Sequence, residues 1–94
     1  MTVGLLIIDC LCGCGQSLKE KRRFINSLFA RLKKEFNVSV LEMDYQDLWQ
    51  RSKLAICFVN NSNDASLKTK SNLLKFLENY PYLTILDHQY HRLY

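Results

Sequence analysis

Residues 2–20 read TVGLLIIDCLCGCGQSLKE and contain the clearest secondary-structure signals of the chain. Thr2–Cys12 is rich in Val, Leu and Ile without helical spacing and stops at Gly13, which predicts a β-strand. Ser17 and Glu20 form a capping box, in which the Ser17 hydroxyl accepts from the Glu20 N–H and the Glu20 carboxylate accepts from the Ser17 N–H. The stretch therefore predicts a strand, a glycine-containing turn and the start of a helix.

The helix that starts here is predicted to be amphipathic. At about 100° per residue, its apolar side chains fall on one stripe and five bases fall on the opposite side. The apolar residues are Leu18, Ile25, Leu28, Phe29, Leu32 and Phe36. The bases of the outer side are Lys19, Arg22, Arg23, Lys33 and Lys34.

A β-hairpin is predicted after this helix. Residues 38–43 and residues 53–59 are rich in apolar and β-branched side chains, which favour strands. Residues 45–50 lie between the two runs and predict the connecting loop. We expect the two strands to pair in an antiparallel arrangement.

A second helix and a short last strand complete the expected elements. The turn residues 60–64 are followed by an apolar stripe that ends before Pro81. This stripe consists of Leu67, Leu73, Leu74 and Leu77. Residues 83–86 predict a short strand, and residues 87–94 predict a polar and aromatic tail.

The expected order of elements, β-α-β-β-α-β, is that of an α+β ferredoxin-like sandwich. In this fold two helices cover one face of a four-stranded antiparallel sheet. A chain of 94 residues with 48% hydrophobic residues is in the globular range and holds one core. We therefore expect a single ferredoxin-like domain over residues 1–94.

Both faces of this sheet are expected to be apolar. The first strand carries Leu5 and Ile7 on one side and Leu6 and Ile8 on the other. A sheet with only one covered face ordinarily alternates polar and apolar residues. We expect the open face to bind a second subunit, so that the protein is a homo-oligomer and, in an alternative function, a protein-interaction module.

The composition indicates a cytoplasmic protein that does not enter a membrane. The longest apolar run, residues 3–8, is far shorter than the roughly 20 residues that a membrane span needs, and it lacks the flanks of a signal peptide. Three of the four cysteines are crowded at Cys10, Cys12 and Cys14 without an export signal. We therefore expect reduced thiols.

Positive charge is concentrated on the first helix. Residues 17–34 hold seven bases and one acid, a net charge of +6, whereas the rest of the chain has six bases and eight acids. Such a concentration on one element is typical of a polyanion-binding surface. The outer bases predict an RNA-binding face that neutralises phosphates, and the alternative is an ordinary solvated helix face.

Residues 17–23 read SLKEKRR, and residues 37–40 and 44–51 read NVSV and DYQDLWQR. Together with the second helix around Phe76, these strings resemble the YlxP-like family of small uncharacterised bacterial proteins. The likeness spans essentially the whole chain. It implies a ferredoxin-like fold and no established activity. It also implies an association with RNA or a ribosomal particle, because genes of this family often lie near those for translation initiation and ribosome maturation.

The chain departs from the pattern of that family at two places. The position of Tyr45 is commonly a histidine in the family, and residues 10–15 are commonly free of cysteines. A role that rests on the histidine is therefore not carried over, and a role for the cysteines would be particular to this protein.

The predicted hairpin loop is a second candidate for contacts with nucleic acid. Tyr45 or Trp49 can stack on an unpaired base, while Gln46 and Arg51 can form hydrogen bonds. The alternative is that Trp49 folds back and caps the core. A turn at residues 13–17 precedes the first helix and offers an anion its free N–H groups, or is simply a strand-to-helix turn.

The cysteine series suggests soft-metal binding as a weaker alternative. Thiolates at Cys10, Cys12 and Cys14 suit copper(I) or zinc, although the C-x-C-x-C spacing differs from the C-x-x-C of ferredoxin-like metal chaperones. Cys10 and Cys12 share a strand face and are placed equally well to be core residues. We therefore expect no bound metal and no cofactor.

No group of residues predicts catalysis. Activation of Cys14 would require the helix N-terminus and Lys19 to lower its pKa, and no arginine follows it at phosphatase spacing. His88 and His91 are expected on the surface. The nearest carboxylate pair, Glu42 and Asp44, lacks any marked cleft. We therefore expect a protein that is not an enzyme.

Overall fold

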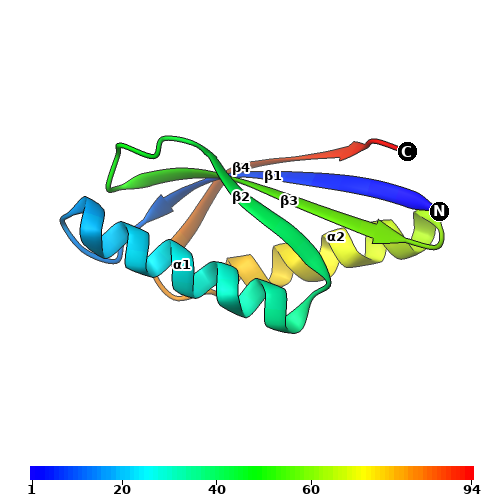
Figure 1. The fold of residues 1–94 in the computed structure, drawn as a ribbon, viewed down its shortest axis with the longest axis horizontal. Helices are drawn as coiled ribbons and strands as arrows, with labels where there is room; N and C mark the ends of the chain where they lie inside the picture. Colours follow the sequence, from blue (N-terminus) through cyan, green and yellow to red (C-terminus); the bar gives the residue numbers. More distant parts are fainter.

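The computed structural model describes residues 1–94 as one antiparallel sheet with two helices (Figure 1). The elements are β1 (Thr2–Cys12), α1 (Leu18–Glu35), β2 (Val38–Asp44), β3 (Arg51–Asn60), α2 (Asn63–Glu78) and β4 (Leu83–Arg92). The strands lie in the order β2-β3-β1-β4. This order and the βαββαβ sequence of elements confirm the predicted ferredoxin-like fold.

The start of α1 differs in one detail from the predicted capping box. The Ser17 hydroxyl accepts from the Glu20 N–H at 3.2 Å, as expected. The Glu20 carboxylate accepts from the N–H of Gln16, at 2.9 Å, and not from that of Ser17. The Glu20 side chain thus folds back over Gly15, where a Cβ atom would meet the Glu20 carboxylate and displace it.

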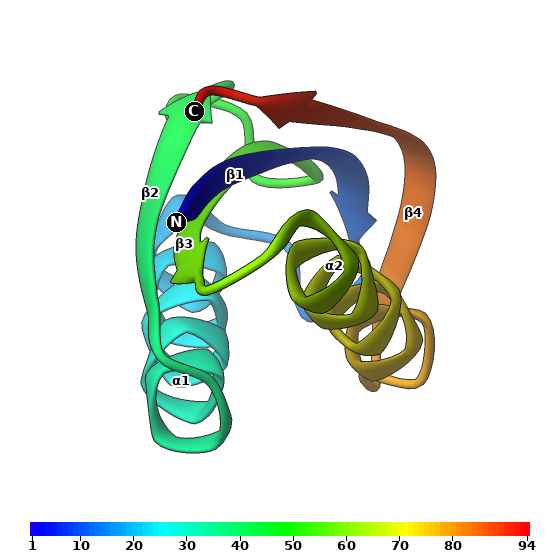
Figure 2. The same cartoon turned by 90° about the vertical axis from the view of Figure 1, so that its right-hand side faces the viewer.

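Both helices lie on the same side of the sheet (Figure 2). The covered face of β1 presents Leu6, Ile8 and Cys10, as predicted from the alternation of this strand. The hydrophobic core consists of Leu6, Ile8, Cys10, Cys12, Ile25, Leu28, Leu32, Leu54, Ile56, Phe58, Leu73, Leu77 and Leu83. The core thus lies between the sheet and the apolar stripes of α1 and α2.

The opposite face of the sheet carries no helix (Figure 2). Leu5 and Ile7 of β1 lie half-buried on this open face, beside Cys57 and Ala55 of the neighbouring strand. The prediction of two apolar faces is therefore confirmed for the two central strands. In addition, Asp9 pairs with Lys53, and this pair stands between Asp44 of β2 and Asp87 of β4, so one charged row of three acids and one base crosses the apolar surface.

The predicted short last strand and polar tail are wrong. β4 extends to Arg92, and the residues after Leu86 pair with β1 as far as Gly4. A register shift between Asp9 and Cys10 lets the strand continue through the polar segment. The Tyr90 ring packs against the core. This packing and the backbone pairing with β1 give the segment a strand conformation in spite of its polar composition.

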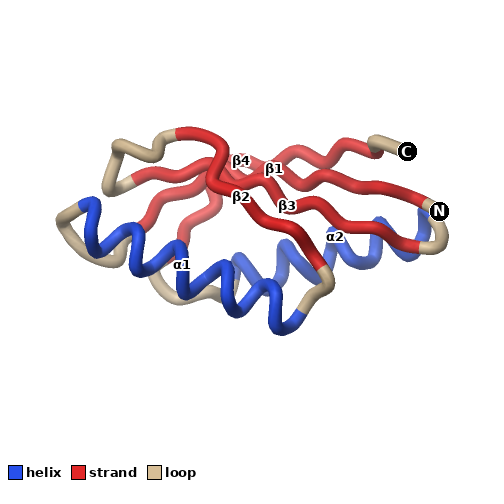
Figure 3. Tube along the Cα trace, in the orientation of Figure 1, coloured by secondary structure: helices blue, strands red, loops and turns tan.

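Short connections join the elements, and the loop between β2 and β3 stands at one end of the sheet (Figure 3). The predicted boundaries of the hairpin strands and of the second helix shift by a few residues. The second helix begins at Asn63 because Ser62 caps it, accepting from the Ala65 N–H at 3.1 Å. Neither helix is long and apolar enough to cross a membrane.

Candidate nucleic-acid interface

The outer side of α1 carries a continuous set of bases. We call Lys19, Arg22, Arg23, Lys33 and Lys34 the basic face, and all five side chains are exposed. At about 100° per residue they occupy one sector of the helix, opposite the buried Ile25, Leu28 and Leu32. The only other residues of this sector are Asn26 and Ala30, so no carboxylate interrupts it.

The two acids of α1 lie outside the basic face and already have partners. Glu20 accepts from the Gln16 N–H at 2.9 Å. Glu35 pairs with Arg31 at 3.3 Å, and the Arg31 guanidinium lies over the Phe76 ring at 5.5 Å. The positive charge of the basic face is therefore not neutralised by its own helix.

Lys21 does not belong to the basic face, although the charge count included it. Its side chain is 1% exposed, and its Nζ lies 2.8 Å from Glu42 Oε2. The same Nζ donates to the Tyr45 carbonyl oxygen at 2.6 Å. Lys21 is thus unavailable to a phosphate, and its role is to join α1 to the end of β2 and to the hairpin loop.

The contact of Lys21 brings two parts of the predicted site together. Lys19, Arg22 and Arg23 lie in the first turns of α1, the part of the helix that Lys21 joins to the loop beginning at Tyr45. Lys33 and Lys34 lie in the last turn, about 20 Å away at a rise of about 1.5 Å per residue. The basic face therefore has three bases at the end of α1 that is tied to the hairpin loop and two bases at the other end of the helix.

Tyr45 and Arg51, two of the residues predicted to contact bases, interact with each other. Arg51 donates to both carboxylate oxygens of Asp9, at 3.1 and 2.8 Å, and its guanidinium lies over the Tyr45 ring at 4.4 Å. The bonds from Arg51 hold the pKa of Asp9 below its ordinary value, and the bonds to Asp9 raise the pKa of Arg51. Tyr45 adopts a left-handed backbone with φ 64°. The Arg51 guanidinium is therefore largely engaged within the chain.

Trp49 does not pack against the hydrophobic core. It is half-buried and lines a surface cavity of 340 Å³ with Leu11, Leu48, Gln50 and Arg51. Leu11 and Leu48 are themselves 40% and 50% exposed. The alternative in which Trp49 caps the core is therefore wrong. The predicted loop residue Gln46 is exposed, and its amide donates to the Glu42 carbonyl oxygen.

A family model described as "Protein of unknown function (DUF503)" matches residues 3–90. The chain belongs to the DUF503 family. It is also 34% identical over 79 residues to the "Uncharacterized protein YlxP" of Bacillus subtilis (strain 168), with 84% of this chain and 86% of that protein covered. The resemblance stated from residues 17–23 and 44–51 is therefore confirmed, and the family match includes all of α1 and the whole hairpin loop.

The Tyr45 side chain takes no part in the contact between α1 and the hairpin loop of this DUF503 chain. Lys21 binds the main-chain carbonyl of residue 45, not its side chain. The connection between α1 and the hairpin loop is therefore independent of the side chain at this position.

The cysteines of the DUF503 chain are separated by burial. Cys10 and Cys12 are core residues, whereas Cys14 is half-buried in the turn before α1. The neighbouring Cys12 sulfur and burial raise the pKa of Cys10, and burial raises the pKa of Cys14. Cys14 is therefore not an activated thiolate. No three His, Cys, Asp or Glu side chains gather where they could hold a metal ion.

The turn before α1 offers little room for an outside anion in this DUF503 chain. The Gln16 N–H donates to Glu20, and the Gly13 N–H donates to the Tyr82 carbonyl oxygen at 2.8 Å. The Glu20 carboxylate thus occupies the position that an anion would take at the helix N-terminus.

Sequence reasoning missed the groove of the DUF503 chain that adjoins the basic face. This cavity of 530 Å³ is lined by Cys14, Glu20, Arg23, Phe24, Ser27 and Tyr82. Tyr82 is 71% exposed and has a left-handed backbone with φ 66°, so its ring stands out of the connection between α2 and β4. In the sequence, Pro81 predicts only a turn before Tyr82. The sequence does not reveal that the Tyr82 ring and Arg23 line one groove.

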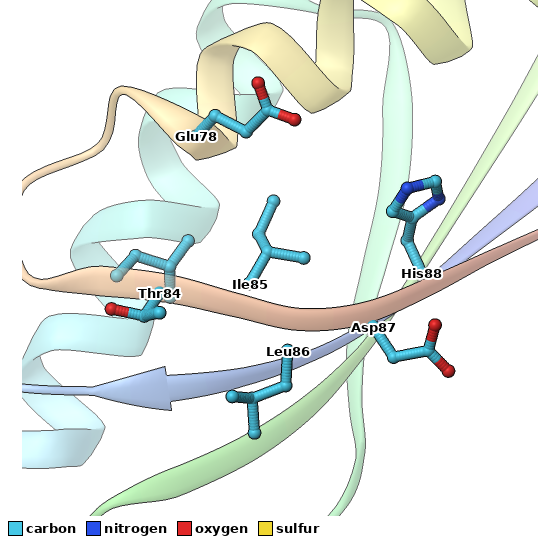
Figure 4. A pocket seen from close by; sticks show the side chains of 7 residues that line it. Glu78, Thr84, Ile85, Leu86, Asp87 and His88 are labelled. Carbon is cyan, nitrogen blue, oxygen red and sulfur yellow. The ribbon is translucent and has the colours of Figure 1, made fainter.

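The largest surface cavity of the DUF503 chain, 600 Å³, lies where β4 bends away from the end of α2. Figure 4 shows Ile85 and His88 on the side of β4 that faces Glu78, whereas Leu86 and Asp87 point to the other side. The titratable groups therefore do not converge on one point. His88 and His91 are both exposed, as expected from the sequence.

Proposed function

We propose that this protein is a non-enzymatic, RNA- or ribosome-associated protein that binds phosphates through the basic face of α1. The observation that carries the proposal is the sector of five exposed bases without a carboxylate among them. Lysine and arginine side chains that neutralise phosphates release condensed counterions, and this release drives binding without sequence preference. A chain with a net charge of only +4 concentrates its positive potential on this helix.

The strength of phosphate binding should depend steeply on salt. Each phosphate contact to a single strand lowers the logarithm of the binding constant by about 0.7 for each tenfold rise in salt. Five contacts predict a slope of about −3.5 for single-stranded RNA. Lys21 adds nothing to this slope, because its ammonium is buried against Glu42.

Tyr82 is an exposed aromatic side chain that lines a groove with Arg23 of the basic face, and it supplies the base contact in this proposal. Its exposed ring and Arg23 line the same groove, so a nucleotide whose phosphate binds Arg23 can place an unpaired base on the ring. In this proposal a second base binds at the hairpin loop, which Lys21 joins to α1, and stacks on Trp49, because the Arg51 guanidinium already covers one face of the Tyr45 ring.

Charge reversal with a matched control tests the proposal. The double variant Arg22→Glu/Arg23→Glu and the control Lys68→Glu/Lys75→Glu change the net charge equally, and all four side chains are exposed. Binding of each to a labelled single-stranded oligouridylate is measured by fluorescence anisotropy at several salt concentrations. We expect the α1 variant to lose tenfold or more in affinity and to show a shallower salt slope, while the α2 variant keeps the slope of the natural protein.

Sedimentation of tagged protein in a cell lysate tests the association with a particle. Salt-sensitive co-migration with a ribosomal particle that ribonuclease abolishes is the expected result. Equal affinities of the two double variants for RNA, or migration as a small species under every condition, would count against the proposal.

A further inference from the structure

The open face of the sheet is built from matched cross-strand pairs. β1 and β3 are the two central strands, and their open-face residues stand opposite one another. These pairs are Val3 with Val59, Leu5 with Cys57, Ile7 with Ala55, Asp9 with Lys53 and, at the end beside the hairpin loop, Leu11 with Arg51. Val59 and Leu11 are 58% and 40% exposed, and the other members are half-buried. Apolar side chains arranged in such a continuous patch mark an interaction surface.

We propose that a second copy of this chain covers this face, related to the first by a two-fold axis that runs along the strands between β1 and β3. The proposal goes beyond RNA binding and does not depend on it. Three features of the open face favour a second copy as its occupant. They are the symmetry of the cross-strand pairs, the charged row and the area of the face.

The cross-strand pairs of β1 and β3 are compatible with this two-fold axis. A two-fold axis along the strands exchanges β1 with β3, so each β1 residue meets the β3 member of the same pair in the second copy. Val3 then meets Val59, and Ile7 meets Ala55, so apolar residues meet apolar residues. Asp9 meets Lys53 of the second copy, and Lys53 meets Asp9, so the central pair of the charged row is complementary to itself. The outer members of the row, Asp44 of β2 and Asp87 of β4, come opposite each other at the edges of the two sheets.

The charged row also excludes the other face-to-face arrangement. A two-fold axis across the strands places β1 on β1 and β3 on β3. It then stacks Lys53 on Lys53, or lays the charged row over apolar pairs, and both outcomes are unfavourable. Lys53 takes part in none of the ion pairs of its own chain, whereas Asp9 is held by Arg51. The Lys53 ammonium is therefore available to a carboxylate of the second copy.

The open face is large enough for a specific dimer. Strands of 7 to 11 residues form the sheet. At about 3.3 Å per residue and about 4.8 Å per strand, the face measures about 600 Å². Two such faces bury about 1,200 Å², at the lower end of stable interfaces. Because the helices lie on the opposite side of the sheet, both basic faces stay exposed in this dimer (Figure 2).

Sedimentation equilibrium of the natural chain and three variants tests the dimer. At concentrations from micromolar upward we expect the mass to rise from 11.1 kDa to twice that value. Lys53→Asp should raise the dissociation constant tenfold or more because like charges then face each other, whereas Lys53→Arg should keep the dimer. Lys68→Asp on α2 is the matched control for net charge and should behave as the natural chain.

A second readout uses the natural thiols. Cys57 lies on the open face and should be alkylated by iodoacetamide more slowly as the protein concentration rises, because the second copy covers it. Cys14 lies in the turn before α1, away from this face, so its rate should stay constant and serve as the internal control. A monomeric mass at every concentration, or a dimer that survives both Lys53→Asp and Val59→Asp, would overturn the inference.

Discussion

The Lys21 ammonium lies 2.8 Å from the Glu42 carboxylate, beneath the sheet and almost out of contact with water. The same nitrogen donates to the Tyr45 carbonyl oxygen, and the Ser52 hydroxyl donates to Glu42 at 2.5 Å. Hydrogen bonds thus satisfy both charges and hold the first turns of α1 against the hairpin. This pair positions one half of the basic face, although it contributes no cation to it.

Removing one partner of this pair should destabilise the domain strongly. Glu42→Ala leaves the Lys21 ammonium buried without a counter-charge, and we expect a loss of about 3 kcal/mol in the free energy of unfolding. The double variant Lys21→Met/Glu42→Leu removes both charges and should recover most of the loss. Urea unfolding measures all three proteins, and a double variant less stable than Glu42→Ala would refute this assignment.

The Asp9–Arg51 pair should make stability depend on acid pH. Because Arg51 lowers the pKa of Asp9 in the folded state, the contribution is fully present above the ordinary value of 3.8 and is lost as pH falls through the folded pKa. The effect should be modest, since the Arg51 side chain is 40% exposed. Urea unfolding between neutral pH and acid should give a flatter dependence for Asp9→Asn than for the natural chain. Identical curves would contradict the pairing.

Gly4 should tolerate no side chain. A Cβ atom at this position would lie 2.9 Å from atoms of Phe58, Ser66 and Tyr90. We expect Gly4→Ala to cost about 1–3 kcal/mol through overpacking of the core. Gly13→Ala is the control, because a Cβ there would meet only the Tyr82 carbonyl oxygen at 3.6 Å. Thermal unfolding should separate the two variants clearly, and equal melting temperatures would show that the packing around Gly4 is misassigned.

Substitutions of the stacking residue and of the phosphate-binding residue in the groove beside α1 should change RNA binding in different ways. Tyr82→Ala should weaken the binding of a single-stranded oligonucleotide by about 1–3 kcal/mol without changing the salt slope. Arg23→Ala should reduce the steepness of that slope by about 0.7. Tyr82→Phe keeps the ring and should bind as the natural chain does. A loss in the Phe variant equal to that in the Ala variant would rule out stacking.

The first strand and the first helix are predictable because their signals are local. The apolar run of Thr2–Cys12, the glycine turn and the Ser17 cap lie within neighbouring residues, so backbone preference and side-chain periodicity suffice to place them. The basic face follows from the same periodicity, since helical spacing alone separates its five bases from the buried stripe. The open, apolar side of the sheet follows from alternation along β1.

The length of β4 and the burial of Lys21 are decided by contacts between residues far apart in the sequence. The polar segment after Leu86 becomes a strand because β1 offers it backbone partners. Lys21 stands in a run of solvated bases, and its burial is possible only because Glu42 and the Tyr45 carbonyl meet it beneath the sheet. Local residue patterns are therefore sufficient to place most of the elements and the positive charge. Which charges face the solvent depends on the tertiary fold, because a charge can be buried only where distant residues supply its partners.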